Sequence, residues 1–527
     1  MPTATLLAVP ITAASPPLLE QARSAKAAGA DLLELRADFI DNLPALEHFL
    51  AQPRELPVIL TLRSAAEGGK CCASDAERAA LFQRLAALAP DYVDIEFAAW
   101  RRSPELQAAV RGMSRLPRRA GPPETRDAPP PRLILSQHDL HGTPAALRQA
   151  LEPLLASPAD VVKAVFAAHG ALDACRVLAQ LQKWSHARKL IMLATESAGL
   201  ITRVLARKFN AFAIFAALDS ARQTAPGQPT LRELVEVYRW NEIGPSTTVL
   251  GVVGWPVSHS RSPAIHNAAM RAAGINGVYA PLPVAPTYAA FAAFMDYITQ
   301  NPHLHVSGLS VTIPHKEHAA RWLTEHAFPL SDVAQRVGAV NTLTRTGPAD
   351  WRGDNTDCAG FLAALALVPE SGREKTAAVL GAGGAARAAV CALLLRGYNV
   401  TVFNRTEARS AALANELGCS AQPWAKRLHT PVDVIVNCTA VGMAPTENES
   451  PLPAAALRSK PPATVIDAVY NPAETRLLRE ARQHGCRIVS GTEIFLAQAA
   501  AQFETWHKTT APLDVMRQIM SGKIVPR

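Results

Sequence analysis

The chain has 527 residues, of which 49% are hydrophobic and 19% charged, with a formal net charge of +8. This length and composition predict a globular protein of two to four domains, and they exclude a fibrous or largely disordered chain. Scattered basic residues argue against a nucleic-acid partner, and cysteines without any C-x-x-C pair argue against a metal site. No apolar run reaches the roughly 18 residues of a membrane span and no signal peptide is evident, so we expect a cytoplasmic protein.

The first half of the chain repeats one pattern about eight times, with a period of roughly 30 residues. Each repeat is a short apolar run followed by an amphipathic stretch, which is typical of a parallel strand and its crossover helix. The runs begin at Leu6, Asp31, Pro57, Tyr92, Arg132, Asp160, Lys189 and Ala211. Eight such units predict a (β/α)8 barrel. An open doubly wound sheet is the alternative that the pattern alone leaves open.

Polar residues recur at the ends of the apolar runs, which in a barrel form the catalytic mouth. They are Glu34, Arg36, Arg63, Glu96, His138, Thr195 and Glu196. One polar residue at a strand end merely faces water, but their recurrence on consecutive strands favours a site. Between Gly112 and Arg132 proline and arginine dominate, and we interpret this segment as a surface loop between the fourth helix and the fifth strand.

The second half begins near Thr247 with alternating short strands and helices. From Thr376 a strand, a glycine turn, a helix and a second strand follow, and the stretch after Gly491 is helical. This order predicts further α/β units, of which the one from Thr376 has the strand–turn–helix–strand pattern of a Rossmann domain. The predicted domains are residues 1–242, 247–365, 366–490 and 491–527.

Lys163 lies inside the apolar run V-V-K-A-V, where a charged amine is costly unless it has a partner or a chemical task. Burial favours the neutral amine, which is a nucleophile toward a ketone. His138 lies at the end of the preceding predicted strand, so both side chains can reach one cavity. An imidazole beside an imine-forming lysine is what proton abstraction next to a carbonyl requires. The structural alternatives are a lysine that extends to water and an ordinary core or surface histidine.

The first half resembles type I 3-dehydroquinate dehydratases. The matching segments are E-L-R at Glu34–Arg36, T-L-R-S-A-A-E-G-G at Thr61–Gly69, S-Q-H-D at Ser136–Asp139, V-V-K at Val161–Lys163, G-L-I-T-R at Gly199–Arg203 and T-A-P-G-Q at Thr224–Gln228. The resemblance implies that Lys163 forms an imine with the substrate, that His138 moves the proton and that Glu67 orients His138. It also implies substrate contacts, to the carboxylate from Arg203 and Gln228, and to hydroxyls or the pocket wall from Glu34, Arg36, Arg63 and Thr224. Thr195 departs from the methionine that is common in this family.

The segment G-A-G-G-A-A follows a predicted strand and opens a helix, as a dinucleotide-binding turn does. Its glycines permit close approach to a pyrophosphate, and the helix N-terminus favours the anion. The next strand ends at Arg405, where NAD enzymes usually place an acidic residue; Arg405 and Arg409 suit a 2′-phosphate instead, so we predict NADP. A solvated helix start is the structural alternative. The predicted cofactor contacts are Gly381, Ala382, Gly383, Gly384, Ala385, Ala386, Asn404, Arg405, Thr406 and Arg409.

The second half resembles shikimate dehydrogenases over nearly all of Thr247–Trp506. The matching motifs are S-H-S-R-S-P at Ser258–Pro263, V-T-I-P-H-K at Val311–Lys316, G-A-V-N-T-L at Gly338–Leu343, G-D-N-T-D at Gly353–Asp357, D-A-V-Y-N-P at Asp467–Pro472 and G-T-E-I-F-L-A-Q at Gly491–Gln498. The resemblance implies substrate contacts, to the carboxylate from Ser260, Ser262 and Tyr470, and to ring hydroxyls from Thr312, Asn341 and Gln498. It implies an α/β substrate-binding domain, a Rossmann domain and C-terminal helices that return to the substrate-binding domain. It also implies that Lys316 and Asp357 form the pair at the reacting carbon. Cys358 and Ile494 depart from the glycine and methionine that are common there.

The chemistry of ketone reduction agrees with this pair. Hydride addition creates an alkoxide, so a cation and proton donor must lie beside the oxygen; Lys316 supplies both, and Asp357 holds it charged. The two resemblances together imply a bifunctional enzyme that dehydrates 3-dehydroquinate to 3-dehydroshikimate through a lysine Schiff base and reduces the product to shikimate with NADPH. Two alternatives remain: an NAD-dependent quinate/shikimate dehydrogenase in the C-terminal half, or a non-catalytic metabolite sensor.

Overall fold

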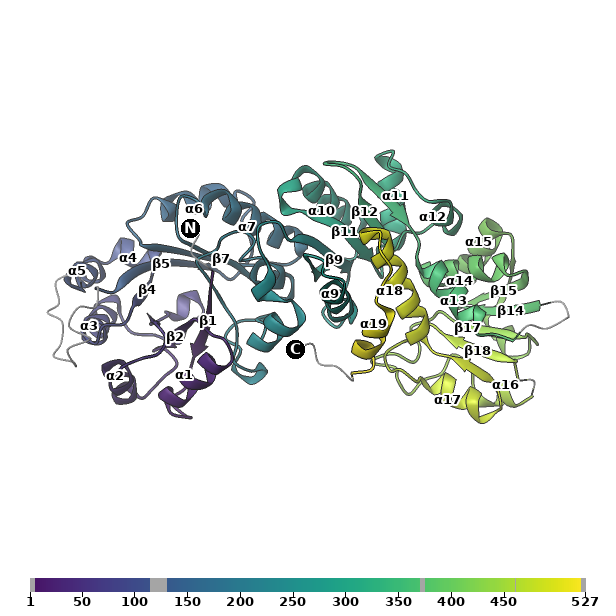
Figure 1. Cartoon of the computed structure of the whole chain (residues 1–527), viewed down its shortest axis with the longest axis horizontal. Helices are drawn as coiled ribbons and strands as arrows, with labels where there is room; N and C mark the ends of the chain where they lie inside the picture. Colours follow the sequence, from purple (N-terminus) through teal and green to yellow (C-terminus); the bar gives the residue numbers. More distant parts are fainter. Residues whose placement is uncertain (1–4, 114–129, 370–374, 460, 523–527) are drawn as a thin grey trace.

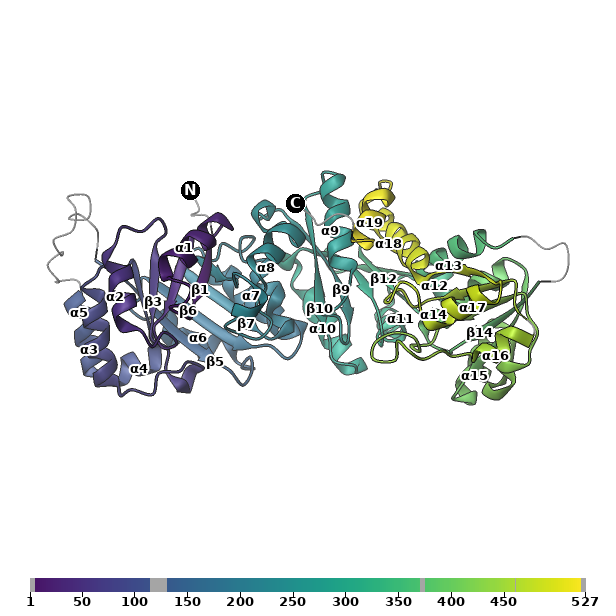
Figure 2. The ribbon, with the colours of Figure 1, turned by 90° about the horizontal axis from the view of Figure 1, so that it is seen from below.

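The computed structural model describes residues 5–113, 130–369, 375–459 and 461–522. Most of the segment predicted as a Pro- and Arg-rich surface loop lies outside these residues. Three sheet-containing units follow one another along the longest axis of the molecule, and the C-terminal helices return to the middle unit (Figures 1 and 2). In the described part of the chain, no helix combines the length and the apolar character that a membrane crossing requires.

The first unit is the predicted (β/α)8 barrel. Its parallel strands follow the order β7-β6-β5-β4-β3-β2-β1-β8, and the amide of Phe212 donates to the carbonyl of Leu190 (2.7 Å) where β8 meets β7. This order excludes the open doubly wound alternative, because neighbouring strands follow one another in the sequence and the last strand, β8, returns to the first, β1. The strands are β1 (Leu6–Ile11), β2 (Leu32–Arg36), β3 (Val58–Thr61), β4 (Tyr92–Glu96), β5 (Arg132–Asp139), β6 (Val161–Ala167), β7 (Leu190–Thr195) and β8 (Ala213–Phe215). The helices are α1 (Leu18–Ala27), α2 (Leu43–Ala51), α3 (Asp75–Ala86), α4 (Phe97–Arg102), α5 (Pro104–Met113), α6 (Leu147–Leu155), α7 (Ala171–Trp184) and α8 (Leu200–Val204).

The strand period of two decides which side chains face the barrel interior. In β6, Val162, Ala164 and Phe166 belong to the hydrophobic cluster that packs under the helices, whereas Val161 and Val165 belong to a separate inner cluster. Lys163 lies between Val161 and Val165 in this alternation and therefore points into the barrel. Lys163 is thus a charged residue between two apolar ones on the interior face of β6.

The second unit is a five-stranded mixed sheet of order β10-β9-β11-β12-β13. Its strands are β9 (Thr248–Gly254), β10 (Gly277–Pro283), β11 (Val306–Val311), β12 (Thr342–Arg345) and β13 (Trp351–Asp354). Its helices are α9 (Ser262–Ala272), α10 (Tyr288–Gln300), α11 (Lys316–Glu325), α12 (Asp332–Val337) and α13 (Asp357–Ala366). The strands β9, β10 and β11 are parallel, so their carboxyl ends lie along one edge, where helices α9 and α11 begin.

The third unit is the predicted Rossmann sheet, parallel throughout, with strand order β16-β15-β14-β17-β18-β19. Its strands are β14 (Lys375–Leu380), β15 (Tyr398–Asn404), β16 (Ser420–Pro423), β17 (Val434–Asn437), β18 (Thr464–Asp467) and β19 (Arg487–Val489). Its helices are α14 (Gly384–Leu395), α15 (Glu407–Leu417), α16 (Ala454–Ser459) and α17 (Arg476–Gln483). Two final helices, α18 (Gly491–His507) and α19 (Leu513–Met520), pack against α13 and α9 of the middle unit.

Candidate active sites

The barrel interior collects charged side chains near the carboxyl ends of its strands. Lys163 is 5% exposed, and its ammonium donates to Asp94 Oδ2 (2.9 Å) and to Glu34 Oε1 (3.2 Å). It also lies 4.3 Å from the centre of the Phe215 ring. The sequence predicts that the buried amine has either a polar partner or a chemical role. In the structure its ammonium has two carboxylate partners, because strands β2 and β4 bring Glu34 and Asp94 into the same layer of the barrel interior.

Asp94 is a central residue that the sequence motifs did not single out. It accepts from Lys163 and also from Arg63 Nη2 (2.8 Å) and Ser136 Oγ (2.5 Å). Burial by itself would raise the pKa of the Asp94 carboxyl, but Arg63 and Lys163 outweigh it and hold that pKa well below its usual range. The sequence did contain a signal for Asp94: it lies two residues before Glu96 on an apolar strand, and residues i and i+2 of a strand point to the same face.

His138 and Glu67 form a second contact at the mouth. Glu67 Oε2 accepts from the backbone amide of His138 (3.0 Å) and lies 2.9 Å from its Nδ1. Burial, with the positive charges of Arg63 and Lys163, lowers the pKa of His138 well below its usual value, so its imidazole is neutral at neutral pH. Burial raises the pKa of Glu67 to about 7, against the opposing effect of Arg63.

The remaining candidate residues of the barrel differ in how many of their polar atoms are already hydrogen-bonded within the protein. Arg203 is 1% exposed and donates through Nη1 to the Ala194 carbonyl (2.6 Å), and burial lowers its pKa to about 10. Among the described residues, its Nε has no hydrogen-bond partner. Gln228 Oε1 accepts from Thr224 through the amide (2.7 Å) and Oγ1 (3.1 Å), and Arg36 is engaged bidentately by Asp38. Arg203 therefore remains a buried cation that could receive an anion.

A second site lies where the middle unit meets the Rossmann sheet. Lys316 and Asp357 open helices α11 and α13, and their side chains form a short, largely buried ion pair. A carboxylate in the first turn of α13 is favoured by the helix dipole, whereas the ammonium at the start of α11 needs the carboxylate as its partner. The Lys316 stem also lies against the Rossmann turn, because a Cβ on Gly384 would stand 2.9 Å from Lys316 Cδ.

The other polar candidate residues of this site come from five chain segments. Asn341 Oδ1 accepts from the amide of Thr356 (2.7 Å), and its Nδ2 lies 3.5 Å from Gln498 Oε1 on α18. Ser260 Oγ accepts from the amide of Ser262 (3.2 Å) in the turn before α9. The ring of Tyr470 packs at a tilt against Phe495 of α18 (4.5 Å between ring centres), and burial raises the pKa of Tyr470 although the nearby Arg261 opposes the shift. Thr312 follows β11 and packs beside Gly254 at the same edge.

The turn after β14 fits a dinucleotide. Gly381 has φ of +112°, and a Cβ there would lie 3.0 Å from the Cys438 carbonyl, so the turn requires glycine. A Cβ on Gly383 would meet nothing within 4 Å, and no side chain of the described residues caps helix α14, which leaves open space before its first amides. Arg405 and Arg409 are exposed at the end of β15 and the start of α15. In the described part of the chain, no carboxylate forms an ion pair with either.

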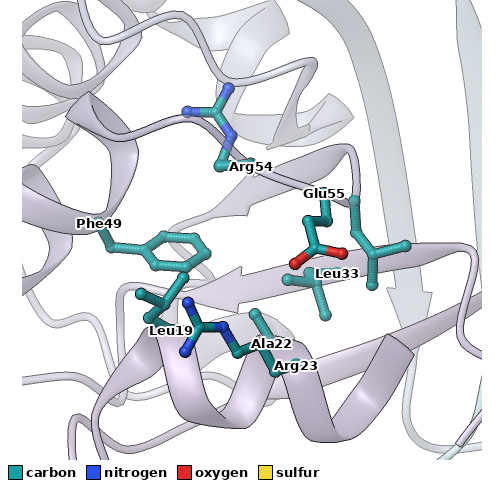
Figure 3. Close-up of a pocket in the computed structure, with 8 residues that line it drawn as sticks. Leu19, Ala22, Arg23, Leu33, Phe49, Arg54 and Glu55 are labelled. Carbon is teal, nitrogen blue, oxygen red and sulfur yellow. The ribbon is translucent and has the colours of Figure 1, made fainter. Parts of the chain in front are cut away.

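Figure 3 shows a small pocket on the outer side of the barrel, between α1 and α2. Its lining combines apolar side chains such as Leu19 and Phe49 with Arg23, Arg54 and Glu55. Arg54 donates to the carbonyl of Ala89 (2.7 Å), and Glu55 pairs with Lys26. The polar groups of Arg54 and Glu55 are thus engaged by the protein, and none of the candidate site residues lines this pocket.

Family models match both halves of the chain. The type I 3-dehydroquinase model matches residues 7–245. The models of the shikimate dehydrogenase substrate binding domain, of shikimate / quinate 5-dehydrogenase and of the shikimate 5'-dehydrogenase C-terminal domain match residues 252–343, 364–471 and 491–520.

Individual proteins match as well. The chain is 34% identical over 519 residues to the chloroplastic bifunctional 3-dehydroquinate dehydratase/shikimate dehydrogenase of Arabidopsis thaliana, an alignment that covers 94% of this chain and 80% of that protein. It is 38% identical over 286 residues to the shikimate dehydrogenase (NADP(+)) of a Synechocystis strain, covering 52% of this chain and 95% of that one. The solved shikimate 5-dehydrogenase of Thermus thermophilus, in complex with NADP(H) and shikimate, aligns with a TM-score of 0.46 and 34% identity, over 53% of this chain and 100% of that chain.

Proposed function

The chain belongs to the family of bifunctional 3-dehydroquinate dehydratases/shikimate dehydrogenases, and we propose that its two sites catalyse the two consecutive reactions. The barrel dehydrates 3-dehydroquinate to 3-dehydroshikimate, and the second half reduces that product to shikimate with NADPH. The observation that supports this assignment is that each half holds a buried or largely buried lysine against a carboxylate. The proposed domains are residues 1–242, 247–365, 366–490 and 491–527.

In the dehydratase reaction, we assign to Lys163 the attack on the substrate ketone. Its ammonium first passes a proton to neutral His138, the freed amine adds to the carbonyl carbon, and the proton returns to the oxygen, which departs as water and leaves a protonated imine. Neutral His138 then removes the proton from the adjacent carbon, and the protonated imidazole returns it to the departing hydroxyl, which leaves as water. Glu67 holds the imidazole and stabilises its charge. Hydrolysis of the imine restores Lys163 and releases the product.

We assign the binding of the substrate carboxylate to Arg203 and Gln228. The unengaged guanidinium edge of Arg203 supports this role, since a buried cation without a carboxylate partner among the described residues is suited to an anionic ligand. Glu34 and Thr224 contact hydroxyls. Arg36 and Arg63 shape the pocket, because carboxylates and Ser136 already occupy much of their hydrogen-bonding capacity.

In the dehydrogenase reaction, Lys316 donates a proton to the substrate oxygen as negative charge develops there, and Asp357 keeps the ammonium charged and in place. NADPH, when bound, supplies the hydride. Ser260, Ser262 and Tyr470 hold the carboxylate, and Thr312, Asn341 and Gln498 hold the hydroxyls. The turn from Gly381 to Ala386 would hold the pyrophosphate, and Asn404, Arg405, Thr406 and Arg409 the adenosine 2′-phosphate.

Chemical trapping tests the dehydratase assignment. Borohydride reduction with substrate or product present should add the mass of the ligand to the peptide that holds Lys163. A matched sample without ligand controls for modification by borohydride alone. Full dehydratase turnover by Lys163→Ala would contradict the assignment. For the other half, oxidation of NADPH on addition of 3-dehydroshikimate is expected, and its absence from folded protein would refute the assignment.

A further inference from the structure

The two halves of the chain meet along an apolar seam. Helix α7 of the barrel packs against α10, and helix α8 packs against β10 (Figure 2). β10 is an edge strand of the middle sheet, so the barrel covers an edge that would otherwise be open. One hydrophobic cluster runs through this contact and includes Leu178 and Leu181 of α7 and Phe294 and Ile298 of α10.

Lys208 is a buried charged residue of this seam. It is 5% exposed, and its ammonium donates to the carbonyls of Pro245 (2.7 Å) and Thr247 (2.8 Å) and to Nδ1 of His305 (2.8 Å). All three N–H donors of this barrel residue therefore go to the linker or to the second half. Burial lowers its pKa to about 8, and in the part of the chain that the structure describes no carboxylate pairs with it. A buried ammonium of this kind is costly unless its hydrogen bonds hold it in one place.

Lys208 lies just beyond helix α8, which carries Arg203. Helix α8 lies against β7 on one side and β10 on the other. The indole N–H of Trp240, a fully buried residue before the linker, donates to the carbonyl of Arg203 (3.1 Å). The backbone of Arg203 is therefore held from the linker side, while its guanidinium contacts the Ala194 carbonyl inside the barrel.

We propose that the dehydrogenase half is a structural part of the carboxylate-binding site of the dehydratase. Lys208 and Trp240 are positioning residues: Lys208 ties the chain after α8 to the linker and the second half, and Trp240 holds the backbone of Arg203 from within the barrel half, so that Arg203 meets the substrate carboxylate. The proposal rests on the proposed function, because it takes Arg203 as the carboxylate-binding residue. The physical reason is that a charge-assisted hydrogen bond weakens when its donor moves by even a fraction of the length of the bond.

Two variants of the full chain test this. Lys208→Met keeps the aliphatic stem and removes the donors, and Trp240→Phe keeps a ring and removes only the N–H. Each should raise the KM for 3-dehydroquinate, Lys208→Met by about ten-fold, with kcat nearly unchanged. Reduction of added 3-dehydroshikimate by NADPH should keep its rate. Lys26→Met, which removes an exposed ammonium paired with Glu55 on the outer side of the barrel, is the matched control and should leave both reactions unchanged.

Arg203→Lys separates the failure of this proposal from the failure of the proposed function. If Arg203→Lys leaves the KM unchanged, the assignment of Arg203 is wrong. If it raises the KM while Lys208→Met and Trp240→Phe do not, the assignment stands and the positioning role is overturned. In the Arg203→Lys background, Lys208→Met should add little, because both act through one contact; fully additive effects would also overturn the proposal. Where Lys208→Met does not fold, His305→Ala, which removes the contact of Lys208 in the second half, decides: an unchanged KM for 3-dehydroquinate would overturn the proposal.

Discussion

Replacing Glu67 by glutamine should remove one limb of the pH profile of dehydration. Glu67 contacts His138 at both its backbone amide and Nδ1, and burial raises the pKa of Glu67 to about 7. The carboxylate form stabilises the imidazolium that forms during proton transfer, so kcat/KM should rise with pH until Glu67 is ionised near pH 7. At pH 6 only about a tenth of the molecules carry the carboxylate.

The size of the effect follows from the contact that is lost. A charge-assisted hydrogen bond contributes about 1.5–3 kcal/mol, so Glu67→Gln should lower kcat by roughly 10- to 150-fold at pH 8. The limb near pH 7 should disappear, because an amide does not titrate. The assay is steady-state dehydration from pH 5.5 to 9, with dehydrogenase turnover of the same samples as the control. An unchanged limb in Glu67→Gln would refute the reasoning, because another group would then be the one that titrates.

The raised pKa of Glu67 affects the stability of the fold in the opposite direction from the dehydratase activity. Because the folded state raises the pKa of Glu67 above its ordinary value of 4.5, the folded chain binds the proton first as the pH falls. Between pH 7 and 4.5 the parent should therefore gain stability relative to Glu67→Gln, although its dehydratase activity falls over that range. Thermal unfolding of the two proteins at several pH values measures the difference, and a parent that loses stability relative to the variant would contradict it.

Three further perturbations have separate expected outcomes. Arg405→Ala should raise the KM for NADPH about ten-fold and change NADH use little, because only NADPH carries the 2′-phosphate; equal losses for both cofactors would show that Arg405 does not recognise the phosphate. Gly381→Ala, which forces a side chain into a φ of +112° beside the Cys438 carbonyl, should weaken NADPH binding in a fluorescence titration and spare dehydration; unchanged binding would mean that the turn tolerates a Cβ. Asp94→Asn leaves Arg63 and Lys163 without their shared counter-ion and should destabilise the barrel by about 3–5 kcal/mol in denaturant unfolding; a barrel as stable as the parent would contradict the central place of Asp94.

The sequence predicts the architecture well because its apolar periodicities are strong. All eight apolar runs of the first half are strands of the barrel, and the glycine turn after Thr376 joins β14 to α14. The pattern works because a barrel strand buries alternate residues on two different faces, which leaves little freedom in register. Lys163 illustrates this, since its place between Val161 and Val165 fixes its direction.

The pairings inside the sites were harder to predict because they join residues that are distant in the chain. Lys163 meets Asp94 and Glu34 only when β2, β4 and β6 close around one interior. Local sequence shows that each is polar on an apolar strand, but it does not say which charges neutralise one another. The contact between Lys208 and His305 is similar, because it depends on how the two halves dock.

The central claim, that one chain carries two separate active sites for consecutive reactions, has a direct test. Purified parent is supplied with 3-dehydroquinate and NADPH, and NADPH oxidation is followed in the parent, in Lys163→Ala, in Lys316→Ala and in an equimolar mixture of the two variants. We predict oxidation by the parent, almost none by either variant alone and recovery in the mixture, since one variant supplies 3-dehydroshikimate to the other. A mixture of folded variants that remains inactive, or a single variant that retains the full coupled rate, would contradict the account.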